Sequence, residues 1–435
     1  MPNSSLRSGE AGTTGRHDRT AAEARHSDMI TVIKNVDVVD VVAGTIRPGQ
    51  HIIVEDGFIR EVSHTNDGFN DAHVIDLNGL TILPGLIDAH VHVTAYTANL
   101  SELNRQSPGY VAARTARVLR DMLSRGFTTV RDVGGADFGI ARAVEEGYFE
   151  GPRVLYGGKA LSPTGGHGDL RPMGVDQEDD AYPFISLGRR CDGLDAVRLA
   201  ARDEIRRGAH HIKIMANGGI SSPTDRITSD QFSEAEIAAI VDEAEMANLY
   251  VVAHTYTARS VARAVRNGVR SIEHGNLIDQ ETVALMKERG VFFVPTLAIF
   301  RALADEGVAA GYPPDRTEKI SAVLDGGIRA VELAHRAGIP MAYGTDLIGP
   351  MQRLQLSEFG LRLEVVPPAD LIRSATIVGA ELLRRDNEIG RIAPGYRADF
   401  VAVRGDPFDA DVLKDFENRI HWVMKDGREA RKDGL

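Results

Sequence analysis

The sequence contains one cysteine, no long apolar run and no block of like charge, and each scarcity excludes a class of protein. Cys191 has no partner for an intrachain disulfide, so the fold does not depend on disulfides. An apolar run of about 18 residues and a secretory signal are both absent, so we expect no membrane association. The 62 acidic and 50 basic side chains give a net charge of -12 without a basic block, which argues against nucleic acid as a partner. We therefore expect a cytoplasmic protein.

The composition is that of a globular protein of two or three domains. Of the 435 residues, 43% are hydrophobic and 26% are charged, which is enough for a large core. Residues 1–28 contain almost no large apolar side chain, and we expect a disordered N-terminal tail there. Short β-branched runs broken by turn residues follow from 29 to 84 and return from 389 to 435. Both chain ends are therefore expected to build one small β-sandwich domain.

Residues 85–388 alternate between apolar strand-like runs and amphipathic helical stretches such as LDAVRLAARDEIRRG and SEAEIAAIVDEAEMAN. The strand candidates are TILPGLIDAHVHV, GFTTVRDV, PRVLYGG, HHIKIMA, YVVAHTY, SIEHG, VFFVPTL and IPMAYGTD. An open doubly wound sheet would tend to carry a glycine-rich dinucleotide turn, which this region lacks. The expected fold is therefore α/β, with a TIM-like (β/α)8 barrel whose chemistry lies at the C-terminal ends of its strands.

Polar residues with metal-binding chemistry occur at the ends of these strand candidates. His90 and His92 are two positions apart on an extended run, so their side chains share a face about 7 Å apart and can converge on one ion. Ordinary packing at a strand end is the alternative. Strand alternation sends Lys213 to the face opposite its two isoleucine neighbours, into the barrel, where a lone ammonium is costly. Either a salt bridge or conversion of the amine to a carbamate by carbon dioxide would resolve that cost.

Three further residues fall at equivalent positions. His254 ends YVVAHTY, His274 lies in SIEHG and Asp346 ends YGTD. Each has an ordinary alternative, a core histidine in two cases and a helix N-cap in the third. Taken together, four histidines, an inward lysine and an aspartate stand at the ends of strand candidates one, four, five, six and eight, which chance would scatter among loops and helices.

The motifs that carry these residues resemble those of the metal-dependent amidohydrolase superfamily. PGLIDAHVHV, GFTTVRDVGG, KIMANGG, VAHTYT, SIEHG and YGTD occur in family order and are followed by IGRIAPGYRADFVAV, over about residues 29 to 430. Within the superfamily the sequence is similar to the imidazolonepropionase-like branch, which includes bacterial Xaa-Pro and Xaa-Arg dipeptidases and ochratoxin-hydrolysing amidohydrolases. The resemblance implies an enzyme and an oligomer, from dimer to octamer.

The resemblance also implies a ligand set. His90 and His92 would bind the more buried of two divalent metals, and His254 and His274 the more exposed one. Lys213, carboxylated at its amine, would bridge them, and Asp346 would complete the first site. We expect zinc, although cobalt, manganese or iron suit the same donors. The bridging water would be activated as hydroxide, and Asp346 would take its proton and return it to the departing amine.

Two nearby motifs are candidates for substrate binding. His167 lies in the glycine-rich segment SPTGGHGD, which is either a plain turn or a loop that closes over substrate. Tyr256 follows His254 by two residues and should face the same side, where its hydroxyl could reach a substrate carboxylate or a developing oxyanion, core packing being the alternative. We interpret Arg131 and Asp132, in TTVRDVGG, as a structural ion pair that closes the barrel.

The expected reaction is hydrolysis of an amide bond in a small molecule. The subfamily resemblance implies a leaving group that is an amino acid with a free carboxylate, as in a dipeptide, an N-acyl amino acid or ochratoxin A. The alternative is a hydrolase of cyclic amides, carbamates or ureas on the same metal centre, because the loops set the pocket in such barrels. A protein that only binds would need at least one of the ligand positions vacated, and all of them are filled.

Overall fold

The computed structural model describes residues 30–65, 72–175 and 185–432; the predicted disorder of residues 1–28 lies outside them. The strands, in chain order, are β1 (Thr31–Asp40), β2 (Thr45–Glu55), β3 (Phe58–Ser63), β4 (His73–Asp76), β5 (Thr81–Pro84), β6 (Leu86–Val91), β7 (Phe127–Asp132), β8 (Arg153–Tyr156), β9 (Ala160–Ser162), β10 (Gly188–Arg190), β11 (Ile212–Met215), β12 (Val251–Thr257), β13 (Ser271–Leu277), β14 (Phe292–Val294), β15 (Phe400–Val403), β16 (Ile420–Lys425) and β17 (Arg428–Lys432).

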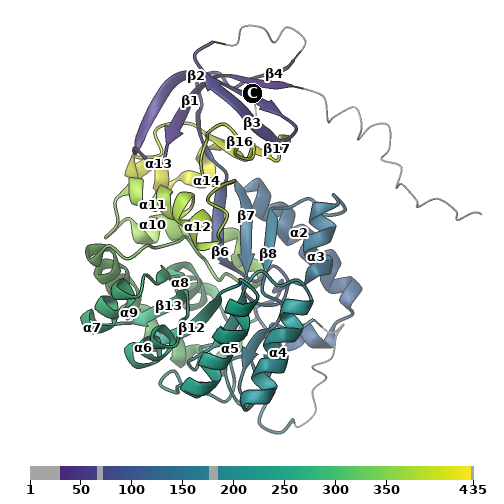
Figure 1. Ribbon diagram of the computed structural model, residues 1–435, viewed down its shortest axis with the longest axis vertical. Helices are drawn as coiled ribbons and strands as arrows, with labels where there is room; N and C mark the ends of the chain where they lie inside the picture. Colours follow the sequence, from purple (N-terminus) through teal and green to yellow (C-terminus); the bar gives the residue numbers. More distant parts are fainter. Residues whose placement is uncertain (1–29, 66–71, 176–184, 433–435) are drawn as a thin grey trace, which may run out of the picture.

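Strands from the two chain ends pair with each other at one end of the molecule (Figure 1). The order is β17-β16-β15-β5-β1-β2-β3, and β4 also pairs with β1. Long β1 makes this possible, because its first half pairs with β4, its second half with β5, and its other edge with β2. The described strands thus form one hydrogen-bonded sheet of eight, where two sheets of a sandwich were expected. Side chains of these strands, among them Ile33, Ile52, Phe400 and Trp422, form a hydrophobic core of their own.

The middle of the chain forms two parallel sheets. One has the order β10-β9-β11-β12-β13-β14 and the other β6-β7-β8, so seven of the eight predicted runs contain a parallel strand. These strands are buried on both faces, as expected for parallel strands covered by helices. Strand pairing alone does not join the two sheets into a closed barrel.

The eighth run, IPMAYGTD, is not a strand, which corrects the prediction. Only Met341 makes a β-bridge, to Phe293 of β14. Pro340 has no N–H to donate, the Tyr343 N–H donates to Ser374 O outside the strands, and the backbone of Asp346 turns to a positive φ of 55°, so the pairing of this segment stays irregular. The segment still lies between the two sheets, because Ala342 N–H donates to Phe293 O at 2.9 Å and Ala89 N–H of β6 donates to Tyr343 O at 2.7 Å.

Helices cover the parallel strands on the outside (Figure 1). Both helical stretches predicted above are present, as α4 and α5, and α5 begins with a capping box between Ser233 and Glu236. The α-helices are α2 (Pro108–Ser124), α3 (Phe138–Glu145), α4 (Leu194–Arg206), α5 (Glu234–Met246), α6 (Ala258–Arg266), α7 (Gln280–Glu288), α8 (Leu297–Glu306), α9 (Thr317–Ala337), α10 (Ser357–Arg362), α11 (Pro368–Ser374), α12 (Ile377–Leu382), α13 (Ala410–Lys414) and α14 (Phe416–Arg419). The described residues also form the 3-10 helices η1 (Leu100–Arg105), η2 (Pro314–Arg316) and η3 (Gly349–Leu354).

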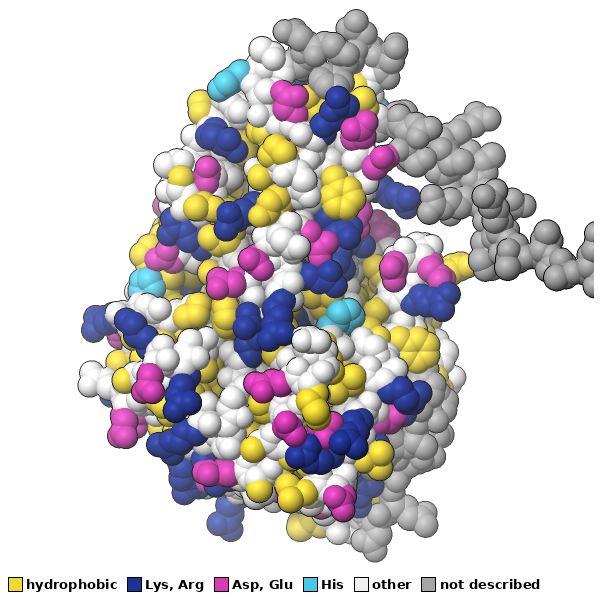
Figure 2. All heavy atoms as spheres, viewed as in Figure 1, with side chains coloured by type: hydrophobic (Ala, Val, Ile, Leu, Met, Phe, Trp, Pro, Cys, Tyr) yellow, Lys and Arg dark blue, Asp and Glu magenta, His cyan; other side chains and the backbone are white. Residues whose placement is uncertain are grey.

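The surface carries both charge signs. Acidic and basic side chains are interspersed on the face seen in Figure 2, as the sequence composition suggested. Among the described residues, no helix combines the length and the apolar character needed to cross a bilayer. The cytoplasmic location stays a prediction.

Candidate active site

One pocket brings together all eight residues singled out from the sequence. His90, His92, His167, Lys213, His254, Tyr256, His274 and Asp346 line it. They come from β6, β11, β12, β13 and the segments that follow β9 and Met341, so the C-terminal ends of the parallel strands meet here. The rest of the lining is largely apolar, from Leu100, Leu170, Leu187, Met215, Ile220, Ile299 and Ile348.

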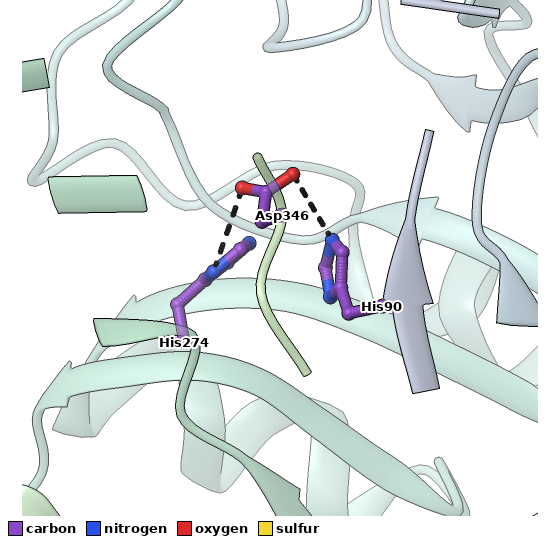
Figure 3. Close-up of side chains that lie close together, drawn as sticks. All are labelled: His90, His274 and Asp346. Atoms are coloured by element: carbon purple, nitrogen blue, oxygen red, sulfur yellow. Dashed lines mark ion pairs between the residues drawn. The ribbon is translucent and has the colours of Figure 1, made fainter. Parts of the chain in front are cut away.

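Asp346 lies at the centre of the histidines. Its Oδ1 is 3.4 Å from His90 Nε2 and 3.2 Å from His92 Nε2, and its Oδ2 is 4.0 Å from His274 Nδ1. The donor atoms of His90, His274 and Asp346 lie within 4.8 Å of one another (Figure 3). This grouping differs from the expected ligand sets, which placed His274 with His254 at the more exposed metal and His90 with Asp346 at the more buried one. Asp346 is not a helix N-cap, because the next helix, η3, has Ile348 at that position.

Two of the three residues in this trio have a backbone conformation that residues other than glycine rarely adopt. The φ angle is 73° at His274 and 55° at Asp346. Such strain persists only where the surrounding structure imposes it, and it is common at functional sites. At His274 it has a visible consequence, because it breaks strand alternation and lets both Glu273 and His274 reach the interior.

His90 and His92 are each fixed by a second partner behind the pocket. His90 Nδ1 is 2.7 Å from Glu273 Oε2, and His92 Nδ1 is 2.7 Å from the carbonyl oxygen of Gly134. Because Nδ1 of each ring is engaged, Nε2 is the nitrogen that faces Asp346. This arrangement, with one ring nitrogen anchored and the other directed into a site, is typical of metal-ligating histidines.

Arg131 pairs with Glu273, and the predicted pairing of Arg131 with Asp132 is wrong. Arg131 Nη2 lies 2.8 Å from Glu273 Oε1, and both side chains are fully buried. Asp132 instead accepts hydrogen bonds from the backbone N–H groups of Val93 and Gly134, and of Ala136, which shapes the turn next to His92. Sequence reasoning missed Glu273 because alternation placed it on the face opposite His274.

A buried aspartate links β6 to the segment that carries Asp346. Asp88 Oδ1 accepts hydrogen bonds from His90 N–H and Thr345 N–H, and its Oδ2 accepts from Thr345 Oγ1 and Gln355 Nε2. Asp88 lies in the motif PGLIDAHVHV, two residues before His90, and this position is the sequence feature from which its role could have been predicted.

His254 and His167 form the opposite side of the pocket. Their rings stack with centroids 4.2 Å apart, and His254 Nε2 has a single long contact of 3.5 Å to the carbonyl oxygen of Gly218. His167 Nδ1 is 2.9 Å from Ser222 Oγ, which donates to Asp225. A Cβ atom on Gly219 would lie 2.0 Å from the His167 ring, so glycine is required at that position.

Neutral groups fix the backbone around Tyr256. Asn217 Oδ1 accepts hydrogen bonds from Tyr256 N–H at 2.8 Å and Thr257 N–H at 3.1 Å, while its amide donates to two carbonyls of the 227–229 segment. The Tyr256 side chain is buried, and its ring lies 4.7 Å from that of His254. Asn217 stands in the quoted motif KIMANGG, although its role could not be read from the sequence.

Comparison with known proteins places this site in a family. The sequence profile of the amidohydrolase family matches residues 81–430. The chain belongs to this family. Ochratoxinase of Aspergillus niger is 31% identical over 373 residues, which cover 81% of this chain and 76% of the relative. A crystal structure of a prolidase complexed with N-methylphosphonate-L-proline is 45% identical, with a TM-score of 0.91 and coverage of 93% of this chain and 100% of the other.

A second solved structure extends the comparison. A Xaa-Pro dipeptidase with bound methionine in its active site is 29% identical, with a TM-score of 0.83, and covers 93% of this chain and 100% of its own. The family match and these neighbours together show that the amidohydrolase is a hydrolase that acts on carbon–nitrogen bonds of small molecules. The resemblance to dipeptidases and ochratoxin-hydrolysing enzymes expected from the motifs is confirmed.

The electrostatics of the amidohydrolase pocket favour cation binding. Burial alone would raise the pKa of Asp346, but the charge of His90 and hydrogen bonds from His90 and His92 lower it well below its usual value. Burial lowers the pKa of His254 and of His274 far below the usual value, so both rings are neutral. Burial also lowers the pKa of Lys213 to about 8, although Glu273 and Asp346 favour its charged form.

The donor set fits divalent metals. Neutral imidazoles with a carboxylate suit zinc and its first-row neighbours, and amidohydrolases are generally metal-dependent. The anchored Nδ1 atoms of His90 and His92 leave their Nε2 atoms as the available donors, next to the Asp346 carboxylate. The residues present therefore fit a metal centre.

Proposed function

We propose that the amidohydrolase cleaves the amide bond of N-acyl amino acids or dipeptides, releasing the C-terminal amino acid, at a binuclear metal centre. One observation carries the proposal: four neutral or anchored histidines, a buried lysine and a carboxylate line one pocket. The ligands would be His90, His92, Lys213, His254, His274 and Asp346, and zinc is the metal we expect. Two bound cations would supply Lewis-acid polarisation of the scissile carbonyl and a water of lowered pKa.

Asp346 is the residue to which we assign proton transfer. Its carboxylate is ionised near neutral pH, stands within 3.4 Å of two histidine Nε2 atoms, and keeps 19% of its side chain accessible. A carboxylate in that position takes a proton from the attacking water. The same group then gives the proton to the leaving nitrogen, so that an amine departs and a carboxylic acid remains.

Lys213 is proposed to be carboxylated. Attack of its neutral amine on carbon dioxide forms an N–C bond and releases one proton, which leaves a carbamate anion. The support is its position: the side chain is 2% exposed, reaches the pocket from β11 and lies among the histidines. A carbamate would replace a costly buried ammonium by an anion that two cations can share.

The pocket chemistry favours a substrate with an apolar acyl group. Seven aliphatic or methionine side chains line the pocket, and Asp346 is the one carboxylate among its described lining residues. A substrate ammonium or a basic side chain therefore finds no further anionic partner there. His167 and Tyr256 are the groups that we assign to the substrate carboxylate, since both line the pocket beside His254, where the Tyr256 hydroxyl and a protonated His167 ring can donate hydrogen bonds to it. The prolidase and ochratoxinase neighbours, by their names, act on amides of proline and on ochratoxin.

The test is product analysis by mass spectrometry. Zinc-loaded protein is incubated with dipeptides, N-acyl amino acids, ochratoxin A, cyclic amides and carbamates, and Asp346→Asn protein is the blank. We expect free C-terminal amino acids from the wild type alone, with substrates that carry an apolar acyl group turned over fastest. Ring-opened or carbamate-derived products without amino acids would contradict the proposed substrate class but not the proposed metal centre.

Three organisational expectations stay proposals. We propose that β6, β7, β8, β11 to β14 and residues 340–346 form one closed ring. The support is the donation of His210 N–H, two residues before β11, to Tyr156 O of β8 at 2.9 Å. We also propose the domain division at residues 29–84, 85–388 and 389–435, and a homo-oligomer in solution. Size-exclusion chromatography with light scattering tests the oligomer.

A further inference from the structure

Beneath the candidate ligands lies a buried ion pair that the proposed function does not use. Glu273 of β13 is fully buried, and its Oε2 lies 2.7 Å from His90 Nδ1, across the interior from β6. The bond determines which nitrogen of the ring is available to the pocket, because Nδ1 is engaged while Nε2 stands 3.4 Å from Asp346 Oδ1. The orientation of His90 therefore depends on Glu273.

Glu273 is itself fixed from two other directions. Arg131 Nη2 donates to both of its oxygens, at 2.8 and 3.0 Å, and Ser271 Oγ donates to Oε1 at 2.6 Å. The same guanidinium donates from Nε to the carbonyl oxygen of Ala89 at 2.6 Å and from Nη1 to Ser271 at 3.1 Å. Since Ala89 precedes His90, Arg131 binds the backbone of the ligand strand and also the carboxylate that binds the ligand ring.

Stability gives no sufficient reason for such an arrangement. Moving two charges into a buried site incurs a desolvation cost that often exceeds their mutual attraction, and apolar residues of similar volume serve a core equally well. Both Arg131 and Glu273 are fully buried. Partners behind a metal-binding histidine, by contrast, typically change metal affinity about 10–100-fold when removed.

We propose that Glu273 is a positioning residue for His90, and that Arg131 and Ser271 fix Glu273 in turn, so that the affinity of the site for metal depends on this buried ion pair. The proposal rests on the proposed function, because it takes His90 to be a ligand. It assigns Glu273 no contact with substrate or with metal.

The experiment measures zinc retained by purified full-length protein after dialysis against graded chelator concentrations, by mass spectrometry of the metal. The variants are Glu273→Gln, Ser271→Ala and the double variant Arg131→Met/Glu273→Gln. Glu204→Gln is the matched control, since Glu204 is a buried glutamate paired with Arg189 and Arg207, away from the pocket. Thermal unfolding of the metal-free proteins shows which variants fold.

We expect Glu273→Gln to lower zinc affinity about 10–100-fold and Ser271→Ala to lower it less, with the control unchanged. Excess zinc should restore kcat in Glu273→Gln with KM near that of the wild type, which a substrate contact would not allow. If Glu273→Gln fails to fold because it leaves Arg131 unpaired, the double variant, which removes both charges, and Ser271→Ala give the same reading.

The proposal is overturned if a folded Glu273→Gln or double variant binds zinc as tightly as the wild type. Failure of the proposed function looks different. In that case the wild type itself would bind no zinc, or would bind it as well after His90→Ala, and the Glu273 result would no longer matter.

Discussion

The two walls of the pocket are built by different means. On the wall formed by His90, His92 and Asp346, buried carboxylates fix the backbone and the ring of His90. Asp88 and Asp132 accept hydrogen bonds from backbone N–H groups, and Glu273 accepts one from the His90 ring. On the wall formed by His254, Tyr256 and His167, a neutral amide and stacked rings make the direct contacts, and the carboxylate of Asp225 reaches His167 only through Ser222. His254 Nε2 has only a contact of 3.5 Å.

The difference indicates that the two walls have different tasks. Charged, buried anchors allow little movement and suit ligands that must keep their positions when a cation arrives or leaves. Stacking and single hydrogen bonds allow small adjustments and suit a surface that must fit around substrate. We therefore expect the first wall to dominate metal affinity and the second to dominate KM.

The largest effect is expected at the centre of the first wall. Asp346→Asn keeps the size of the side chain but removes its negative charge and its ability to accept a proton. Because general acid–base groups contribute about 10²–10⁴-fold, kcat should fall by at least that factor. Steady-state kinetics with an N-acyl amino acid measure it, alongside the metal content of each preparation. Wild-type turnover in a metal-loaded Asp346→Asn protein would contradict the assignment.

Lys213→Ala should also remove most activity, and with it metal. Lys213 stands between the two walls, since the pocket receives it from β11, next to β12 and His254. If a carbamate bridges two cations there, loss of the side chain leaves both underliganded, whereas loss of an unmodified ammonium would strengthen cation binding by removing repulsion. The metal content of Lys213→Ala protein therefore distinguishes the two cases, because it falls if Lys213 is carboxylated and rises if the amine is unmodified. Added acetate should restore part of the activity by supplying a carboxylate to the vacated space.

Much of the site could be predicted from residue spacing, and the exceptions have local causes. His90, His92 and Lys213 obey strand alternation, so the sequence was sufficient to place them on inward faces. Glu273 could not be found that way, because the positive φ of His274 breaks the alternation between them. The prediction that Arg131 pairs with Asp132 was wrong for the same reason.

Other features depend on contacts between distant segments. The eighth run resembles a strand in composition, but its pairing is irregular, because the Tyr343 N–H donates to Ser374, which is distant in sequence. Likewise, Asp225 reaches His167 through Ser222, across more than fifty residues of sequence. No pattern along the chain indicates such a bond, since it depends on how two loops meet.

A smaller effect, confined to the second wall, is expected from Asp225→Asn. Asp225 accepts hydrogen bonds from Ser222 and Gly219 N–H, and is paired with Lys319 at 3.1 Å. The variant weakens the support of His167. A lost buried hydrogen bond of about 1–3 kcal/mol would raise KM about 5- to 150-fold if all of that energy were lost from substrate binding, which sets the upper bound. Metal content should not change. Asp230→Asn, in the same loop but bonded to Ser260 and Arg259, is the control.

The result for Asp225→Asn bears directly on the comparison of the walls. If the variant loses metal as readily as Glu273→Gln, the second wall contributes to metal affinity as much as the first, and the division of tasks is wrong. If KM for substrates with a free carboxylate rises while KM for the corresponding esters stays the same, His167 belongs to carboxylate recognition.

The smallest effect on catalysis is expected from Glu358→Gln, a buried carboxylate that belongs to neither wall. Glu358 on α10 accepts a hydrogen bond from Ala298 N–H at 2.7 Å, next to the pocket residue Ile299, and burial raises its pKa to about 8. A raised pKa means that the folded protein binds more protons than the unfolded chain between about pH 4.5 and 8. The contribution of Glu358 to stability is therefore present below pH 4.5 and is lost as the pH rises through 8.

Glutamine cannot ionise, so the variant should escape this loss. Its melting temperature relative to the wild type should increase from pH 5 to pH 8.5, by about 1 °C for each 1 kcal/mol recovered in a chain of 435 residues. Metal content and kcat should match the wild type, unlike those of Glu273→Gln. A flat difference in melting temperature would mean that Glu358 is ionised in the fold already at pH 5. A loss of metal would mean that any buried carboxylate near the pocket supports the ligands, which would remove the distinction between the anchored wall and the rest.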